Sequence, residues 1–195
     1  MDTIINYKNM SVLWIEATLI TDSGLSRLME LRNLSHLYLA NSSQITDVGL
    51  QHVVGHTSLQ TLSLIGTSVT DTGLKKIEKL TQLTVLTVGG TGTTEASFDT
   101  IVKLSELSLL HLGPTLSSNA GLARLAALPK LSKLIFGHSD RLTDDGLEHL
   151  VKCQRLKEVS FEETKVTEAG VKKLAAARPD MKITWDGKVI GPKKQ

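Results

Sequence analysis

The stretch LQTLSLIGTSVTDTGLKKIEKLTQ, residues 59–82, contains two different spacings of apolar residues. Near its start Leu62 and Leu64 are two residues apart, and this alternation predicts a short strand with one buried face. From Leu74 to Leu80 every third residue is apolar, which predicts one buried face of a short helix. These 24 residues therefore encode a strand, a turn and a helix.

The same pattern recurs along the chain every 24 or 25 residues. The units begin at Met10, Leu34, Leu59, Leu83, Leu107, Leu131 and Leu156. A unit of this size cannot bury both of its apolar faces alone, so we expect successive units to stack and share one core. A further segment, DMKITWDGKVI (180–190), is expected to add a last strand through Ile183 and Trp185.

A nearly constant five-residue slot joins the strand to the helix in each unit. It reads TDSGL (21–25), TDVGL (46–50), TDTGL (70–74), TEASF (94–98), SNAGL (118–122), TDDGL (143–147) and TEAGV (167–171). Thr or Ser always opens the slot, as expected of a helix N-cap, and the next residue is expected to face the positive end of the helix dipole. The fourth residue of the slot is glycine in six of the seven units, and we expect a side chain at this position to collide with the neighbouring unit.

These units resemble leucine-rich repeats of the T-D-x-G-L type, which occur in the cysteine-containing repeats of F-box proteins and in many bacterial repeat proteins. The resemblance implies an α/β solenoid with a horseshoe arc, a parallel sheet on the concave side and short helices on the convex side. We treat residues 1–195 as one domain. Seven repeats span residues 10–178, and residues 179–195 form a C-terminal cap and tail.

The triplet Asp71-Thr72-Gly73 also matches the sequence around the catalytic aspartate of aspartic proteases. That chemistry needs two carboxylates that share one proton. The positions equivalent to Asp71 are expected to lie apart on an outer edge, and some hold Glu or Asn. We therefore interpret Asp71 as part of a helix start and predict no catalytic residue.

Cofactor and metal chemistry receive equally little support from the sequence. The segment GGTGTT (89–94) is rich in glycine but lacks a complete phosphate-binding motif, so we interpret it as a strand-to-helix turn. His52 and His56 are expected on the outer face of a helix without a third ligand. Cys153 occupies an apolar helix position and is expected to be buried. The sequence predicts no cofactor and no metal.

Composition narrows the classes of partner. Aromatic residues make up 4% of the chain and the net charge is +2, which argues against a nucleic-acid interface. No apolar run is long enough for a membrane helix, and no signal-peptide pattern opens the chain. The localisation is not determined; the single cysteine and the lack of a signal peptide favour the cytoplasm.

The outward positions of the strands are where we expect a partner to bind, because alternate residues of a strand face opposite sides of its sheet. The predicted partner-binding residues are Val12, Trp14, His36, Tyr38, Val85, Leu109, His111 and Ile135. Trp14 and Tyr38 form an aromatic end of this surface, and Glu158, Glu162 and Glu163 form a charged end. The alternative is that Trp14 and Tyr38 only cover the open end of the solenoid.

The sequence therefore predicts a non-catalytic scaffold that binds another protein, whose identity it does not reveal. The resemblance to F-box proteins offers an alternative, the substrate-recognition fragment of a ubiquitin-ligase adaptor. An enzyme or a nucleotide-binding protein is the alternative that the residues favour least. Only nine residues precede Met10, so we also expect that the N-terminal end could self-associate or belong to a longer protein.

Overall fold

A computed structural model describes residues 8–90 and 92–192 of the chain. Its main feature is a nine-stranded sheet in the order β1-β2-β3-β4-β5-β6-β8-β10-β11, in which every pair is parallel except β10 and β11. These strands are β1 (Val12–Trp14), β2 (His36–Tyr38), β3 (Thr61–Ser63), β4 (Val85–Val88), β5 (Leu109–Leu112), β6 (Lys133–Phe136), β8 (Glu158–Phe161), β10 (Lys182–Trp185) and β11 (Lys188–Ile190). A separate small sheet pairs β7 (Ser139–Thr143) with β9 (Thr164–Lys165).

Short helices lie between the strands in the chain. The α-helices are α1 (Asp22–Ser26), α2 (Asp47–Val53), α3 (Asp71–Lys75), α4 (Phe98–Ile101), α5 (Asn119–Leu125), α6 (Asp144–Val151) and α7 (Glu168–Ala177). The 3-10 helices are η2 (Arg27–Glu30), η3 (Lys76–Lys79) and η4 (Glu95–Ser97). The α/β class, the mostly parallel sheet and the short helices predicted from the sequence are thus confirmed.

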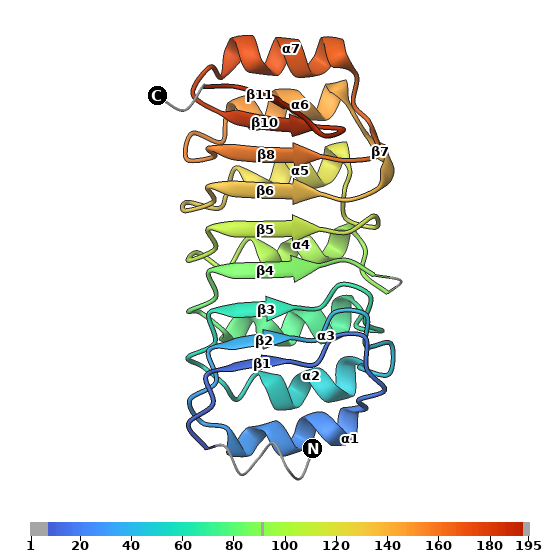
Figure 1. Cartoon of the computed structure of the whole chain (residues 1–195), viewed down its shortest axis with the longest axis vertical. Coiled ribbons are helices and arrows are strands. Elements are labelled where there is room, and N and C mark those ends of the chain that lie inside the picture. The colour runs from blue at the N-terminus through green and yellow to red at the C-terminus, as the bar shows by residue number, and fades with distance from the viewer. Residues whose placement is uncertain (1–7, 91, 193–195) are drawn as a thin grey trace.

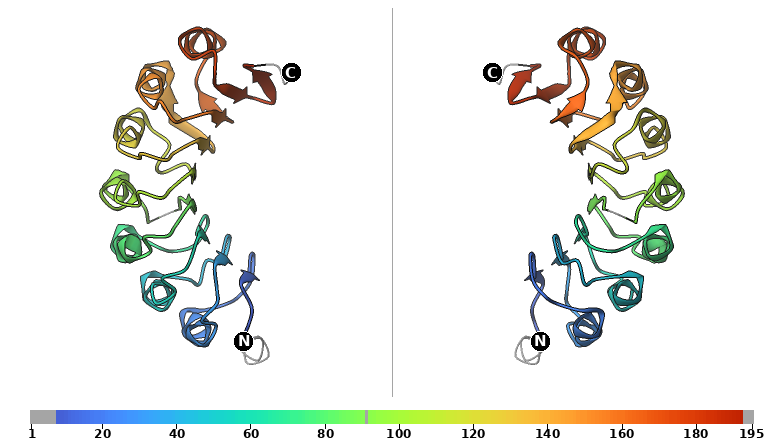
Figure 2. Two further views of the ribbon diagram at one scale, coloured as in Figure 1. Left: turned by 90° about the vertical axis from the view of Figure 1, so that its left-hand side faces the viewer. Right: turned by 90° about the vertical axis from the view of Figure 1, so that its right-hand side faces the viewer.

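The molecule has two layers. Figure 1 shows the strands stacked in chain order, with the helices behind them. Figure 2 shows that the stack is curved, with the strands along the inner side and the helices along the outer side. We call the side of the sheet that faces away from the helices the strand face. It is the surface that the sequence predicts as the binding face.

Adjacent strands pair at equivalent positions of successive units, so equivalent side chains form columns across the sheet. Leu62 pairs with Leu37 on one side and Leu86 on the other, and all three are fully buried. Burial of one leucine contributes about 1.5–3 kcal/mol to folding. Because each column joins every unit to the next, one continuous core runs between the two layers.

The N-caps of the helices form as predicted in six of the seven slots. The hydroxyl oxygens of Thr21, Thr46, Thr70, Thr94, Ser118 and Thr167 each accept a hydrogen bond from an amide of the first helical turn. The seventh, Thr143, makes no such cap. Instead its hydroxyl accepts a hydrogen bond from the side-chain amide of Asn119 at 2.8 Å.

The acidic residue after each N-cap does more than face its own helix. Asp47 Oδ1 accepts the amide of Thr70 at 2.8 Å, and Asp47 Oδ2 accepts the Thr70 hydroxyl at 2.6 Å. Asp22 and Asp144 make the same two bonds to Thr46 and Thr167. These bonds form a ladder that joins each helix start to the next one, and the repeat pattern alone does not predict them.

The glycine of the slot leaves room for this ladder. A Cβ atom added to Gly73 would lie 2.1 Å from Asp47 Oδ1, far inside contact distance. The predicted collision with the neighbouring unit is therefore confirmed at this position. In the slot that lacks glycine, the hydroxyl of Ser97 donates to the carboxylate of Asp71 and so becomes part of the ladder.

His56 differs from its expected position. It does not lie on an outer helix face but follows α2 in the chain, is only 6% exposed, and its Nε2 has no hydrogen-bond partner. The reason is the repeat: His56 occupies the position that Leu31 and Leu80 fill in the neighbouring units, and both leucines are buried. Burial lowers the pKa of the His56 imidazole from its ordinary value of 6.5.

We expect His56→Leu to raise the free energy of unfolding by about 1 kcal/mol at neutral pH, because it removes an unsatisfied buried nitrogen. Well above pH 6.5 the imidazole is neutral in both the folded and the unfolded chain. Below it the unfolded chain takes up a proton that the folded chain does not, so acid lowers stability. The variant should lose less stability between pH 6.5 and 5 in urea titrations. His52→Gln is the control, and an equal loss in His56→Leu and the original chain would contradict this account.

Candidate binding surface on the strand face

The eight predicted binding residues all lie on the strand face, on alternate positions of five strands. One column contains Val12, His36, Val85 and Leu109, and the other contains Trp14, Tyr38, His111 and Ile135. The leucines between them in the chain point to the core. Alternation along each strand therefore places these residues on one side, but it does not determine which of them touch.

Trp14 and Tyr38 form a stacked aromatic pair at the N-terminal end of the strand face. They are register partners on β1 and β2, and their ring centroids lie 3.7 Å apart with 16° between the ring planes. Neighbouring strands are about 4.8 Å apart, so aligned flat rings stack naturally. Trp14 nevertheless remains 62% exposed. The pair is thus pre-arranged, with Tyr38 half-buried and Trp14 largely open to solvent.

Val12 and His36 lie next to this pair in the other column. They are register partners on β1 and β2, and Val12 is an exposed large apolar side chain. The Nδ1 atom of His36 lies 2.8 Å from the hydroxyl of Ser35, which fixes one side of the ring by a hydrogen bond. Val12, Trp14, His36 and Tyr38 therefore form one group, which we call the aromatic end.

A second group occupies the middle of the face. Val85 pairs with Leu109, and His111 pairs with Ile135; all four are half-buried. Burial lowers the pKa of His111, an effect that the nearby Glu162 partly offsets. This ring is therefore neutral at neutral pH, and the middle group is mainly apolar.

Small hydroxyl residues separate the two groups. Thr61 and Ser63 on β3 are each only 5% exposed, and the Thr87 hydroxyl donates to Ser63 at 2.8 Å. The structure therefore brings the predicted residues together as two patches on one face. A partner that contacts both patches would also have to cover these small hydroxyl side chains.

The C-terminal end of the face is charged, as the sequence predicts, and lysines balance part of its negative charge. The carboxylate of Glu158 lies 3.2 Å from the Lys133 ammonium and 2.8 Å from the Lys182 ammonium. The hydrogen bond from Lys182, with that from Lys133, holds the Glu158 pKa below its ordinary value despite partial burial. The carboxylate of Glu163 contacts Nδ1 of His138. Lys133, Glu158 and Lys182 are register partners in one column of the sheet, which explains why both lysines reach the same carboxylate.

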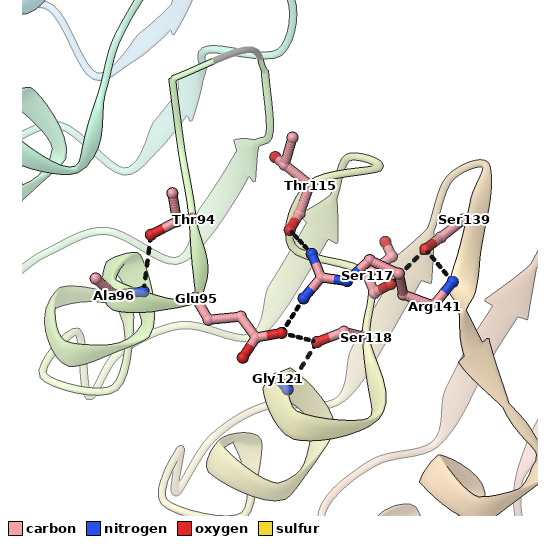
Figure 3. A network of polar contacts seen from close by, with 9 residues as sticks. All are labelled: Thr94, Glu95, Ala96, Thr115, Ser117, Ser118, Gly121, Ser139 and Arg141. Carbon is pink, nitrogen blue, oxygen red and sulfur yellow. Dashed lines mark hydrogen bonds and ion pairs between the residues drawn. The ribbon is translucent and has the colours of Figure 1, made fainter.

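A polar network lies in the strand-to-helix turns (Figure 3). Arg141 donates to the Thr115 carbonyl at 3.1 Å and to the carboxylate of Glu95, which is 46 residues away in the chain. The Ser118 hydroxyl also donates to Glu95, at 2.8 Å, and accepts the Gly121 amide at 3.1 Å. Glu95 and Arg141 thus bind each other and groups of the neighbouring turns, so we interpret the network as structural.

The glycine-rich segment of residues 89–94 lies between β4 and η4, as a turn should. Gly89 has a φ of +143°, and an added Cβ would lie 2.4 Å from the Cα atom of Gly113. Close approach of two backbones thus requires this glycine. Thr91 lies outside the described residues.

Other kinds of site find no support within residues 8–90 and 92–192. In that part of the chain, no group of three or more His, Cys, Asp or Glu side chains is arranged to hold a metal ion. None of the helices described there is long and apolar enough to cross a membrane. Cys153 is buried, as expected, and burial raises the pKa of its thiol.

No protein-family model matches the chain, and no curated protein matches it.

Proposed function

We propose that this chain is a leucine-rich-repeat solenoid that recognises another protein through its strand face, without catalysing a reaction on it. The repeat assignment is supported by the strand pairing. Equivalent residues such as Leu62 and Leu86 pair across units that repeat every 24 or 25 residues. The Asp-to-Thr ladder, which recurs at the same place between units, supports it as well.

The observation that carries the functional proposal is the exposed stack of Trp14 on Tyr38. Protein interfaces are enriched in tryptophan and tyrosine, and their strongest contacts are rigid aromatic anchors beside smaller residues. Here the two rings are already stacked, so binding would cost little side-chain entropy. The half-buried Val85, Leu109 and Ile135 extend the apolar area along the face.

The alternative that these aromatics only cover an open end of the core is less consistent with their exposure. A covering side chain is itself packed on apolar neighbours, as Phe136 is against Phe161 at a centroid distance of 5.5 Å. Trp14 instead presents most of its surface to solvent. Its truncation should therefore affect binding more than folding.

We expect the double change Trp14→Ala with Tyr38→Ala to abolish capture of the partner. Truncation of central aromatic anchors costs about 2–4 kcal/mol each, or at least a hundredfold in affinity overall. Thermal melts should change little, because an exposed aromatic pair contributes about 0.5–1.5 kcal/mol to folding. The measurement is quantitative affinity capture from extracts with the immobilised chain and the double variant.

Met29→Ala provides the matched control, because Met29 is an exposed apolar side chain of η2, in the helix layer. Proteins that bind the strand face should be retained by the original chain and by this control but not by the double variant. An identical set of captured proteins from all three would contradict the proposal. A collapsed melt in the double variant would also contradict it, since the rings would then be structural.

A further inference from the structure

The free face of Trp14 offers a specific kind of contact. Tyr38 covers one side of the indole at a centroid distance of 3.7 Å, and the 62% exposure of Trp14 shows that the opposite side is open. An open indole face carries negative potential above the ring, which attracts cations. A flat cation can lie parallel to the ring and extend the existing stack.

A carboxylate lies on the same side of the chain. Glu16 follows Trp14 by two residues, and the buried Ile15 between them points to the core. The sheet ladder continues through this segment, because the Ile15 amide donates to the Tyr38 carbonyl at 2.9 Å and the Ala17 amide donates to the Ala40 carbonyl at 2.8 Å. Glu16 begins the turn that follows β1, and because the ladder continues through it, the alternation of side chains places Glu16 on the same side as Trp14.

This carboxylate is available for a partner. Glu16 is exposed, and within the described part of the chain it makes no hydrogen bond and no ion pair. At the other end of the face the equivalent acid is Glu162, which has no indole beside it, because Ser160 occupies the position of Trp14 there. The positions that match Glu16 in the next three units are Ala40, Ile65 and Gly89, which carry no charge. The combination of indole and free carboxylate therefore occurs at the aromatic end.

We propose that Trp14 and Glu16 together bind an arginine side chain of the partner protein. The inference rests on the proposed function and specifies the chemistry of that partner. The guanidinium would stack on the open indole face and donate two parallel N–H bonds to the Glu16 carboxylate. Lysine fits less well because its ammonium is neither planar nor forked. A nucleic acid could stack a base on Trp14, but Glu16 would repel its phosphates.

The test uses the two tryptophans of the chain as reporters, since each gives its own indole N–H signal in a ¹⁵N-labelled sample. The probe is the capped peptide acetyl-Gly-Gly-Arg-Gly-Gly-amide. Matched probes replace arginine with citrulline, which is planar but neutral, or with lysine. Trp185 is the internal control, because its indole N–H donates to the Val166 carbonyl at 3.1 Å. The Trp14 signal should shift with arginine and the Trp185 signal should not.

We expect a dissociation constant on the order of millimolar for the arginine peptide and about tenfold weaker binding for citrulline. Glu16→Gln should weaken arginine binding about threefold and abolish most of its salt dependence. Equal shifts with arginine and citrulline, no shift at Trp14, or a stronger shift with adenosine monophosphate would each overturn the inference. Such a result would leave the capture experiment unaffected, so the failure of this inference can be told from failure of the proposed function.

Discussion

Arg178→Ala should lower the free energy of unfolding by about 2–4 kcal/mol, because it removes the donors of buried carbonyl groups and a side chain that fills the core. Arg178 is buried and donates to the carbonyls of Cys153 at 2.9 Å and Leu156 at 2.7 Å. The Nε–H group of the same guanidinium donates a hydrogen bond to the Asp180 carboxylate at 2.9 Å. Its removal would leave the carbonyls of Leu150, Cys153 and Leu156 without these donors and would open a cavity beneath the last helix.

The position of Arg178 explains why the loss should be large. In the preceding units the equivalent residues are Leu128 and Cys153, whose side chains fill the core. Arg178 fills that space in the last helical unit and bonds the backbone of the unit before it. The hydrogen bonds from Arg178, with that from Lys157, hold the Asp180 pKa well below its ordinary range, so the pair stays ionised in mild acid.

Urea denaturation would measure this effect, and amide exchange in β10 would locate it. Arg178→Lys keeps the charge but lacks the planar fork, so we expect it to recover only part of the lost stability. Arg155→Ala is the control, since Arg155 is an exposed arginine nearby in the chain, and it should change stability by less than about 0.5 kcal/mol. If Arg178→Ala lowered the free energy of unfolding by less than about 1 kcal/mol, Arg178 would not be needed to fill the core of the last helical unit.

The sequence predicted those features that depend on position within one unit. Alternation placed Trp14, Tyr38 and the other six candidate residues on the strand face, and the slot residues predicted the helix N-caps, six of which form. These predictions succeed because side-chain direction in a strand and capping at a helix start are local properties. They also identified the C-terminal strand through Ile183, although not its antiparallel partner β11.

Contacts between units were harder to predict. The Asp47–Thr70 bonds, the pairing of Glu158 with two lysines and the reach of Arg141 to Glu95 all depend on register and on side-chain rotamers. The sequence pattern of one unit specifies neither the register between units nor the side-chain rotamers. His56 and Arg178 could have been found from the sequence, because both occupy a column of leucines, and a polar residue in a core column must be either paired or strained.

The close contact between Gly73 and Asp47 leads to the second large effect. Gly73→Ala should lower the free energy of unfolding by about 2–3 kcal/mol, although alanine is favoured over glycine inside a helix by about 1 kcal/mol. The new methyl would displace the Asp47 carboxylate, because its position lies 2.1 Å from Oδ1 and 3.0 Å from the Asp47 Cα atom. The bonds from Asp47 to the amide and hydroxyl of Thr70 would then be lost.

A double-mutant cycle with Asp47→Ala tests this explanation directly. Asp47→Ala alone should cost about 2 kcal/mol, since it leaves the Thr70 amide without its acceptor. Once the carboxylate is absent, the methyl of Gly73→Ala meets less obstruction. The double variant should therefore be at most about 1 kcal/mol less stable than Asp47→Ala alone. The two changes should therefore couple by about 1–2 kcal/mol in urea titrations.

Gly55→Ala is the matched control for the cycle. A Cβ atom added to Gly55 would lie 3.8 Å from the His52 carbonyl oxygen, which is ordinary contact, so this variant should be close to neutral. If Gly73→Ala instead stabilised the chain, or if its cost simply added to that of Asp47→Ala, the glycine would not be there to make room for the carboxylate. The spacing between units would then be set by the apolar columns alone, and the Asp-to-Thr ladder would follow from the stacking rather than help to fix it.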